Sequence, residues 1–123
     1  MCTENLKEFC GEKVAWKVVY EKTSGKVVSP FYSSFRWAKG ENIAYLSPGF
    51  HCFARRSDAR DFKKEEKKLQ ELNRNSNKAK ARMIRVVVSR AVFTGKIRGI
   101  GVNFQDKPAI CGMVANWDGK FVS

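Results

Sequence analysis

The segment "KVAWKVVYE", residues 13–21, has the clearest strand pattern in the chain. Apolar side chains recur at every second position from Val14 to Tyr20, with mainly polar or small residues between them. Since successive side chains of a strand point to opposite faces, this period predicts a strand with one buried face. The turn at 23–25 lets "KVVS", residues 26–29, return antiparallel as a hairpin.

Short strands and turns dominate the rest of the chain. A polar lead predicts a helical turn at 5–10, and 30–42 is an aromatic-rich, irregular segment. Strands are expected at 43–46, at 50–54, at 83–93 with apolar residues on both faces, and at 108–117. The glycines at 95, 99 and 101 favour a turn with a bulged strand over a phosphate-binding loop.

One segment has the pattern of a helix. Ser57 can cap its N-terminus, acidic residues follow in its first turn, and turn-forming residues near Asn73 end it. A thin apolar stripe suits a helix lying on a sheet, and its members are Ala59, Phe62, Leu69 and Leu72. We interpret "KKEEKK", residues 63–68, as a solvated face. The sequence therefore predicts an α+β fold: a compact single domain over residues 1–123, with a mostly antiparallel, twisted sheet and one main helix packed on it.

The composition restricts location and cofactors. Apolar runs stay far below the ~20 residues that span a bilayer, and the first twenty residues do not resemble a secretory leader. We expect a cytoplasmic protein with no membrane partner. The four cysteines lack metal-binding spacing, so we expect reduced thiols, Cys52 and Cys111 buried in strands, and neither metal nor cofactor.

Charge gives the main functional indication. Twenty-four Lys and Arg against twelve Asp and Glu leave a net charge of +12, and the excess is largest after Arg74. Such a potential attracts nucleic acid, nucleotides or an acidic protein. Aromatic and basic residues also mix within 31–37, where bases could stack beside paired phosphates. The residues predicted to bind phosphate or ligand are Arg36, Trp37, His51, Arg55, Arg56, Arg82, Arg85, Arg90, Lys96 and Arg98. Those on the late strands would form one stripe if the strands pair.

His51, the only histidine, lies in "SPGFHCF", residues 47–53. Strand alternation places it on the same face as Phe53 and places Cys52 on the other, which argues against a dyad with that cysteine. Three roles stay open for His51: a core side chain, a ligand contact, or a catalytic group.

The combination of "AWKVVYEKTSGKVVSPFYSSFRW", "GFHCF", "SDA" and a late Val-rich strand resembles small proteins of phages and bacteria with a Lys-Val opening, a Ser-Pro-Phe segment and a Gly-Phe-His core. The resemblance covers roughly residues 14–100. It implies interference with a host nucleic-acid or nucleotide pathway, by association with a phage origin, and a location in the host cell cytoplasm if the protein is phage-encoded.

We therefore predict a small basic protein, not an enzyme, that binds nucleic acid or a nucleotide. Two alternatives stay open. The chain could be an inhibitor or adaptor that docks its positive face on an acidic host protein. It could also be a nucleotide-acting enzyme that uses His51 as a base or ligand.

Overall fold

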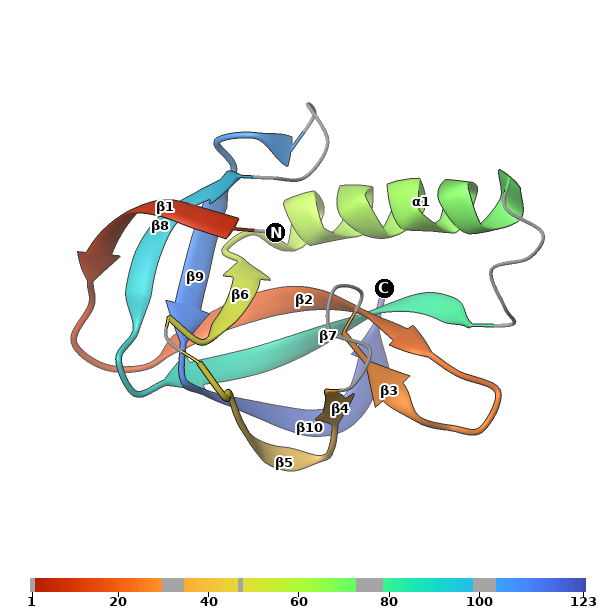
Figure 1. Cartoon of the computed structure of the whole chain (residues 1–123), viewed down its shortest axis with the longest axis horizontal. Coiled ribbons are helices and arrows are strands. Elements are labelled where there is room, and N and C mark those ends of the chain that lie inside the picture. The colour runs from red at the N-terminus through yellow and green to blue at the C-terminus, as the bar shows by residue number, and fades with distance from the viewer. Residues whose placement is uncertain (1, 30–34, 47, 73–78, 99–103) are drawn as a thin grey trace.

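The computed structural model describes residues 2–29, 35–46, 48–72, 79–98 and 104–123 (Figure 1). Within these ranges the elements are β1 (Cys2–Glu8), β2 (Lys13–Glu21), β3 (Val27–Val28), β4 (Arg36–Trp37), β5 (Gly40–Ile43), β6 (Phe50–Phe53), α1 (Arg56–Leu72), β7 (Lys80–Ser89), β8 (Phe93–Arg98), β9 (Pro108–Gly112) and β10 (Val114–Val122). The fold is a mostly antiparallel sheet with one helix in the described part of the chain, in line with the predicted α+β class. No described helix is long and apolar enough to cross a membrane.

The strands form one strongly curved sheet in the order β1-β8-β9-β6-β2-β7-β10-β5, with β3 and β4 added beside β2 (Figure 1). Its centre is the antiparallel pair of β2 and β7, in continuous register from Lys13 opposite Val88 to Glu21 opposite Lys80. The predicted hairpin is confirmed, since Tyr20 pairs with Val28 across β2 and β3.

β2 is covered on both faces, whereas its alternating pattern predicts burial of one face only. Ala15 and Val19 point into a core enclosed by strands, here called the sheet core, together with Val27, Trp37, Phe50, Cys52, Ile84, Val86, Val88, Val92, Ile110, Ala115 and Trp117. Val18 points the other way, into the helix-side core, with Phe53, Ala59, Phe62, Ala81, Met83, Ile97, Phe104 and Ala109. The positions of β2 that the pattern predicts to face solvent include Ala15 and Val19, and their small or aliphatic side chains can be buried in the sheet core.

α1 packs along the helix-side face over β2 and β7 (Figure 1). It begins at Arg56, so Ser57 lies inside the first turn and is not the N-cap. α1 continues to Leu72, and the predicted end near Asn73 lies outside the described residues. Ala59 and Phe62 are buried as expected, but Leu69 is 56% exposed. Glu66 contacts the sheet instead and accepts a hydrogen bond from the Tyr20 hydroxyl.

Several predicted boundaries of strands and turns are wrong. Two of these errors arise because the chain turns a corner within each of two predicted late strands. The strand expected over 83–93 breaks at Arg90 and Ala91, which have φ of 57° and 49°, values that end a strand. The strand expected over 108–117 breaks at Met113, whose N–H donates to the Arg90 carbonyl. The strand expected at 43–46 lies at β5, three residues earlier, and the turn expected at 5–10 is largely occupied by β1.

Gly49 directly precedes β6 and packs against the backbone of the corner between β9 and β10. Its φ is 95°, and a Cβ at this position would overlap the backbone carbonyl of Gly112. Because the obstacle is backbone, it cannot move aside as a flexible side chain would. We expect Gly49→Ala to lower the free energy of unfolding by about 3 kcal/mol or more, measured by urea denaturation. Gly25→Ala is the control: its φ is 88° but it has open space, so about 1 kcal/mol is expected. Equal losses would contradict the steric explanation.

The Tyr20–Glu66 hydrogen bond joins β2 to α1, and burial together with Glu66 raises the pKa of Tyr20. Tyr20→Phe leaves a partly buried carboxylate without this donor, so we expect a loss of about 1–2 kcal/mol of unfolding free energy. Tyr45→Phe should change it little, since no hydrogen bond of the Tyr45 hydroxyl occurs among the described residues, and the residue is 81% exposed. Thermal unfolding of both variants tests this, and a neutral Tyr20→Phe would mean that packing alone holds α1.

Candidate functional site

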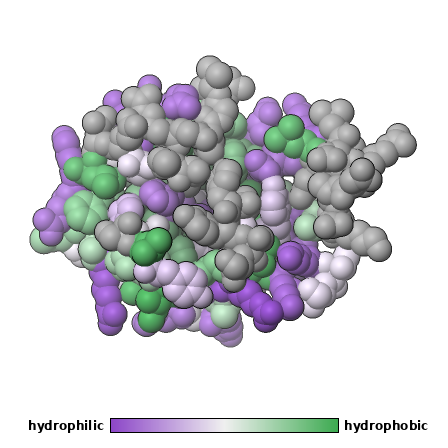
Figure 2. All heavy atoms as spheres, viewed as in Figure 1, coloured by the Kyte–Doolittle hydropathy of each residue, from purple (hydrophilic) through white to green (hydrophobic). Residues whose placement is uncertain are grey.

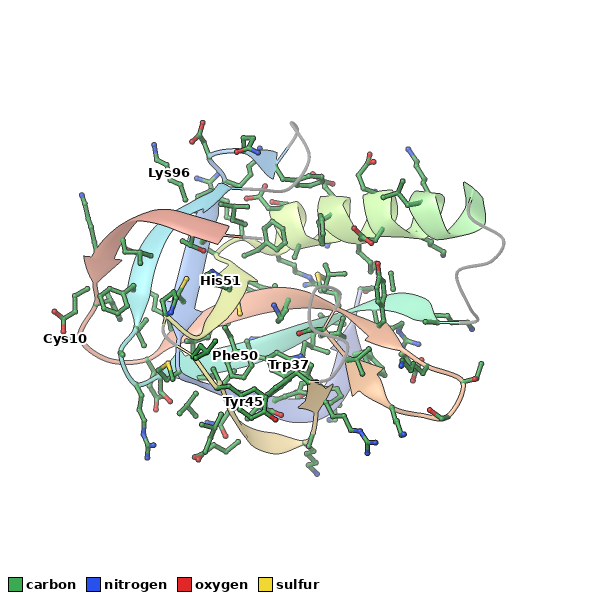
Figure 3. All side chains as sticks on the ribbon, viewed as in Figure 1. Cys10, Trp37, Tyr45, Phe50, His51 and Lys96 are labelled. Atoms are coloured by element: carbon green, nitrogen blue, oxygen red, sulfur yellow. The ribbon has the colours of Figure 1, made fainter. Side chains whose placement is uncertain are left out.

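His51 lies on β6, between β2 and β9 in the sheet order (Figure 3). The predicted alternation is confirmed: Phe50 and Cys52 enter the sheet core, whereas Phe53 enters the helix-side core. His51 itself is half-buried and lies directly opposite Cys111 of β9. Cys52 and Cys111 are both buried in strands, as expected.

Three contacts fix His51. Its Nδ1 lies 2.7 Å from the Thr3 hydroxyl oxygen on β1 and 3.4 Å from the Cys111 sulfur. Its backbone carbonyl accepts a hydrogen bond of 2.9 Å from the Lys17 ammonium. Sequence analysis gave no indication of Thr3, Cys111 or Lys17 here, because they lie 48, 60 and 34 positions away along the chain.

Burial controls the electrostatics of this cluster. Desolvation, and after it the charge of Lys17, lowers the pKa of His51 to about 4, so the imidazole is neutral near pH 7. Burial raises the pKa of Cys52 to about 11 and also raises that of Cys111, while it lowers that of Lys17. Protonated thiols beside a neutral imidazole lack the thiolate that nucleophilic chemistry needs. No group of three or more His, Cys, Asp or Glu among the described residues could hold a metal ion.

The predicted aromatic-basic segment is divided between core and surface. Trp37 is buried in the sheet core and its Nε1 donates to the Ser29 hydroxyl at 3.1 Å, so its ring is not available for stacking. Arg36, its neighbour on β4, is exposed. Phe31 and Tyr32 lie outside the described residues.

The predicted late stripe is not assembled, because β7 and β8 do not pair and three strands separate them in the sheet order. Arg85 and Lys96 are exposed on different strands, and Arg90 is exposed in the turn between them. Arg82 binds Glu21 at 3.0 Å and covers the Phe121 ring. The side chain of Arg98 lies outside the described part.

The predicted pair of arginines at the helix start is exposed, but its members differ. Arg55 precedes α1, whereas Arg56 is its first residue and donates twice to the Ser123 carbonyl, at 3.0 and 2.6 Å. Among the described residues, His51 contacts Thr3, Cys111 and Lys17 and forms no hydrogen bond with either arginine. The histidine and the arginines therefore do not form one anion site here.

A different basic surface lies on α1, where the sequence predicted only a solvated face. We call Arg60, Lys63, Lys64 and Lys67 the basic flank. At 100° per residue they occupy one side of the helix, and Asp61 and Glu65 lie outside that arc. Burial, followed by the charges of Lys67, Arg82, Arg60 and Lys64, lowers the pKa of Lys63. The spacing from Arg56 through Arg60 and Lys63 to Lys67 could have revealed this flank in the sequence.

Fold and site together define a strongly basic α+β chain with a curved antiparallel sheet, one described helix and a cluster in which the histidine is neutral near pH 7. The chain matches no protein family, no curated protein and no solved structure. Its function is therefore argued from its own geometry.

The depressed pKa of His51 gives a pH dependence with a definite sign. As pH falls, the unfolded chain takes up the proton near the ordinary value of about 6.5, before the folded chain does near pH 4. The contribution of neutral His51 to stability is therefore complete above pH ~6.5 and is lost as pH falls toward 4. With solvent screening, we expect a loss of about 1–2 kcal/mol.

Urea denaturation of wild type and His51→Gln between pH 7 and pH 4 measures this contribution. Carboxylates titrate in both proteins, so the difference between their pH slopes isolates His51. The slope should be steeper in wild type. Equal slopes would show that His51 is not held neutral by the fold.

Proposed function

We propose that this protein binds nucleic acid through the basic flank of α1. The supporting observation is the concentration of four cationic side chains on one side of the helix, close enough that neighbouring positive charges help to lower the pKa of Lys63. Within the described ranges, the ion pairs are Arg82 with Glu21 and Lys107 with Asp58. The flank therefore keeps its cationic groups available for an external anion.

The cationic side chains of the basic flank are spread along the helix axis and do not surround a single point. From Arg60 to Lys67 the helix rises about 10 Å, at 1.5 Å per residue. An extended row of charges suits consecutive phosphates better than the compact phosphate group of one nucleotide. Contacts of this kind carry no sequence information directly, so we expect binding that tolerates changes of base sequence.

The net charge of +12 supports the same function, since it raises the local concentration of polyanions around the whole molecule. The resemblance to small phage proteins makes interference with a host nucleic-acid pathway the expected setting. The enzymatic alternative has less support, because an imidazole with a pKa of about 4 is a weak base and the thiols near it are protonated at pH 7.

Fluorescence anisotropy with a labelled 20-nucleotide strand and the matching duplex tests this proposal, at salt concentrations from about 50 to 200 mM. Wild type should bind at low salt and weaken steeply as counterions compete. Lys64→Glu/Lys67→Glu should weaken duplex binding at least about tenfold and reduce the salt slope by about 2.

The control is Lys22→Glu/Lys26→Glu in the turn between β2 and β3, which makes the same change in net charge with two exposed lysines. It should retain most of the affinity and the salt slope. Negligible binding by wild type at low salt would refute the proposal. Equal losses in both double variants would show that net charge, not the flank, is responsible.

A further inference from the structure

A second surface lies at the β5 edge of the sheet and is apolar. Ile43 is 54% exposed, Tyr45 81% and Leu46 75%, and we call these three residues the β5 patch. Figure 2 shows hydrophobic side chains reaching the surface in the lower part of this face, below the central region. Neighbouring exposed apolar side chains of this size are typical of interaction surfaces.

The Tyr45 ring of the β5 patch packs against a group of aromatic side chains. The Tyr45 ring meets Phe35 edge-on, with centroids 5.6 Å apart, and Phe35 in turn contacts Trp37 at 5.6 Å and Phe50 at 5.1 Å. Figure 3 shows Tyr45, Trp37 and Phe50 gathered between β5 and β6. A ring held in this way loses little conformational entropy when a partner covers it.

The backbone beside the patch has one unpaired side among the described strands. β5 is the last strand of the order and pairs only with β10. The Ala44 N–H donates to the Met113 carbonyl, which continues the β10 side of this ladder. Because backbone groups alternate in direction along a strand, those of Glu41 and Ile43 point away from β10. Such an edge can template another strand.

The charged side chains around β5 indicate the charge of the partner that this surface fits. Arg36 and Lys39 are exposed nearby, and the stem of Lys39 lies over Gly119 of β10. Glu41 is the acidic side chain on β5 itself. A second copy of the chain would bring another +12 charge against this face, which opposes self-association. An acidic partner is complementary.

We propose that an extended segment of a partner protein, with alternating acidic and apolar residues, adds to β5 as an extra strand. Its backbone pairs with the free edge, its apolar side chains cover the β5 patch, and its carboxylates face Arg36 and Lys39. Figure 1 places β5 and α1 on opposite sides of the sheet, so this surface is separate from the basic flank.

The probe is a fluorescein-labelled nine-residue peptide that alternates Glu with Val and Tyr, measured by anisotropy at about 150 mM salt. Two matched peptides replace Glu by Lys, or N-methylate alternate amides so that strand pairing is blocked. Wild type should bind the acidic peptide at least about tenfold more tightly than either. Equal binding of the N-methylated peptide would refute strand addition.

Variants locate the binding surface. The double substitution Tyr45→Ser/Leu46→Ser should weaken binding of the acidic peptide at least about fivefold. Leu69→Ser removes an exposed leucine from α1 and should not change the affinity. Lys64→Glu/Lys67→Glu should retain tighter binding to the acidic than to the N-methylated peptide, which separates this result from nucleic-acid binding.

Sedimentation velocity completes the test. A monomeric wild type is expected. A dimer that Tyr45→Ser/Leu46→Ser dissociates would overturn the proposal, because a second copy would then be the occupant. Absence of acidic-peptide binding, or equal affinity for the Lys peptide, would also overturn it.

Discussion

Burial of the β2–β7 pair on both faces is the constraint on which the rest of the structure depends. Nine consecutive register positions join the two strands, and Ala15 and Val18 point into different cores. A sheet covered on both faces needs two apolar layers, and aromatic side chains are buried in both of them. This requirement explains why Trp37, expected at a binding surface, is a core residue.

The same constraint determines the chemistry around His51. Lys17 lies on the sheet-core face of β2 and reaches the His51 carbonyl, while Cys111 and Thr3 approach from β9 and β1. Removing these groups from water favours their neutral forms. The imidazole is therefore neutral and the two thiols are protonated, so the cluster holds no thiolate, and it connects β1, β2, β6 and β9.

With both faces of the central strands covered, interaction surfaces are left to the periphery of the fold. The exposed side of α1 carries cationic side chains at helical spacing, and the β5 edge carries apolar side chains on an aromatic support. These surfaces differ in chemistry, and we propose a different partner for each: consecutive phosphates at the flank and an extended acidic segment at β5.

The sequence by itself determined what depends on local periodicity. β2 lies at the residues that its alternation predicts, β6 places Cys52 and His51 on opposite faces, and α1 occupies the one segment with a helical pattern. Tertiary structure decided which strands pair, and with that which distant residues meet. Arg82 and Lys96 remain apart because β7 and β8 each pair with other strands, whereas Thr3 and Cys111 reach His51 through pairings that no local pattern encodes. The physical reason is that strand order depends on burying both sheet faces at once, a property of the whole chain.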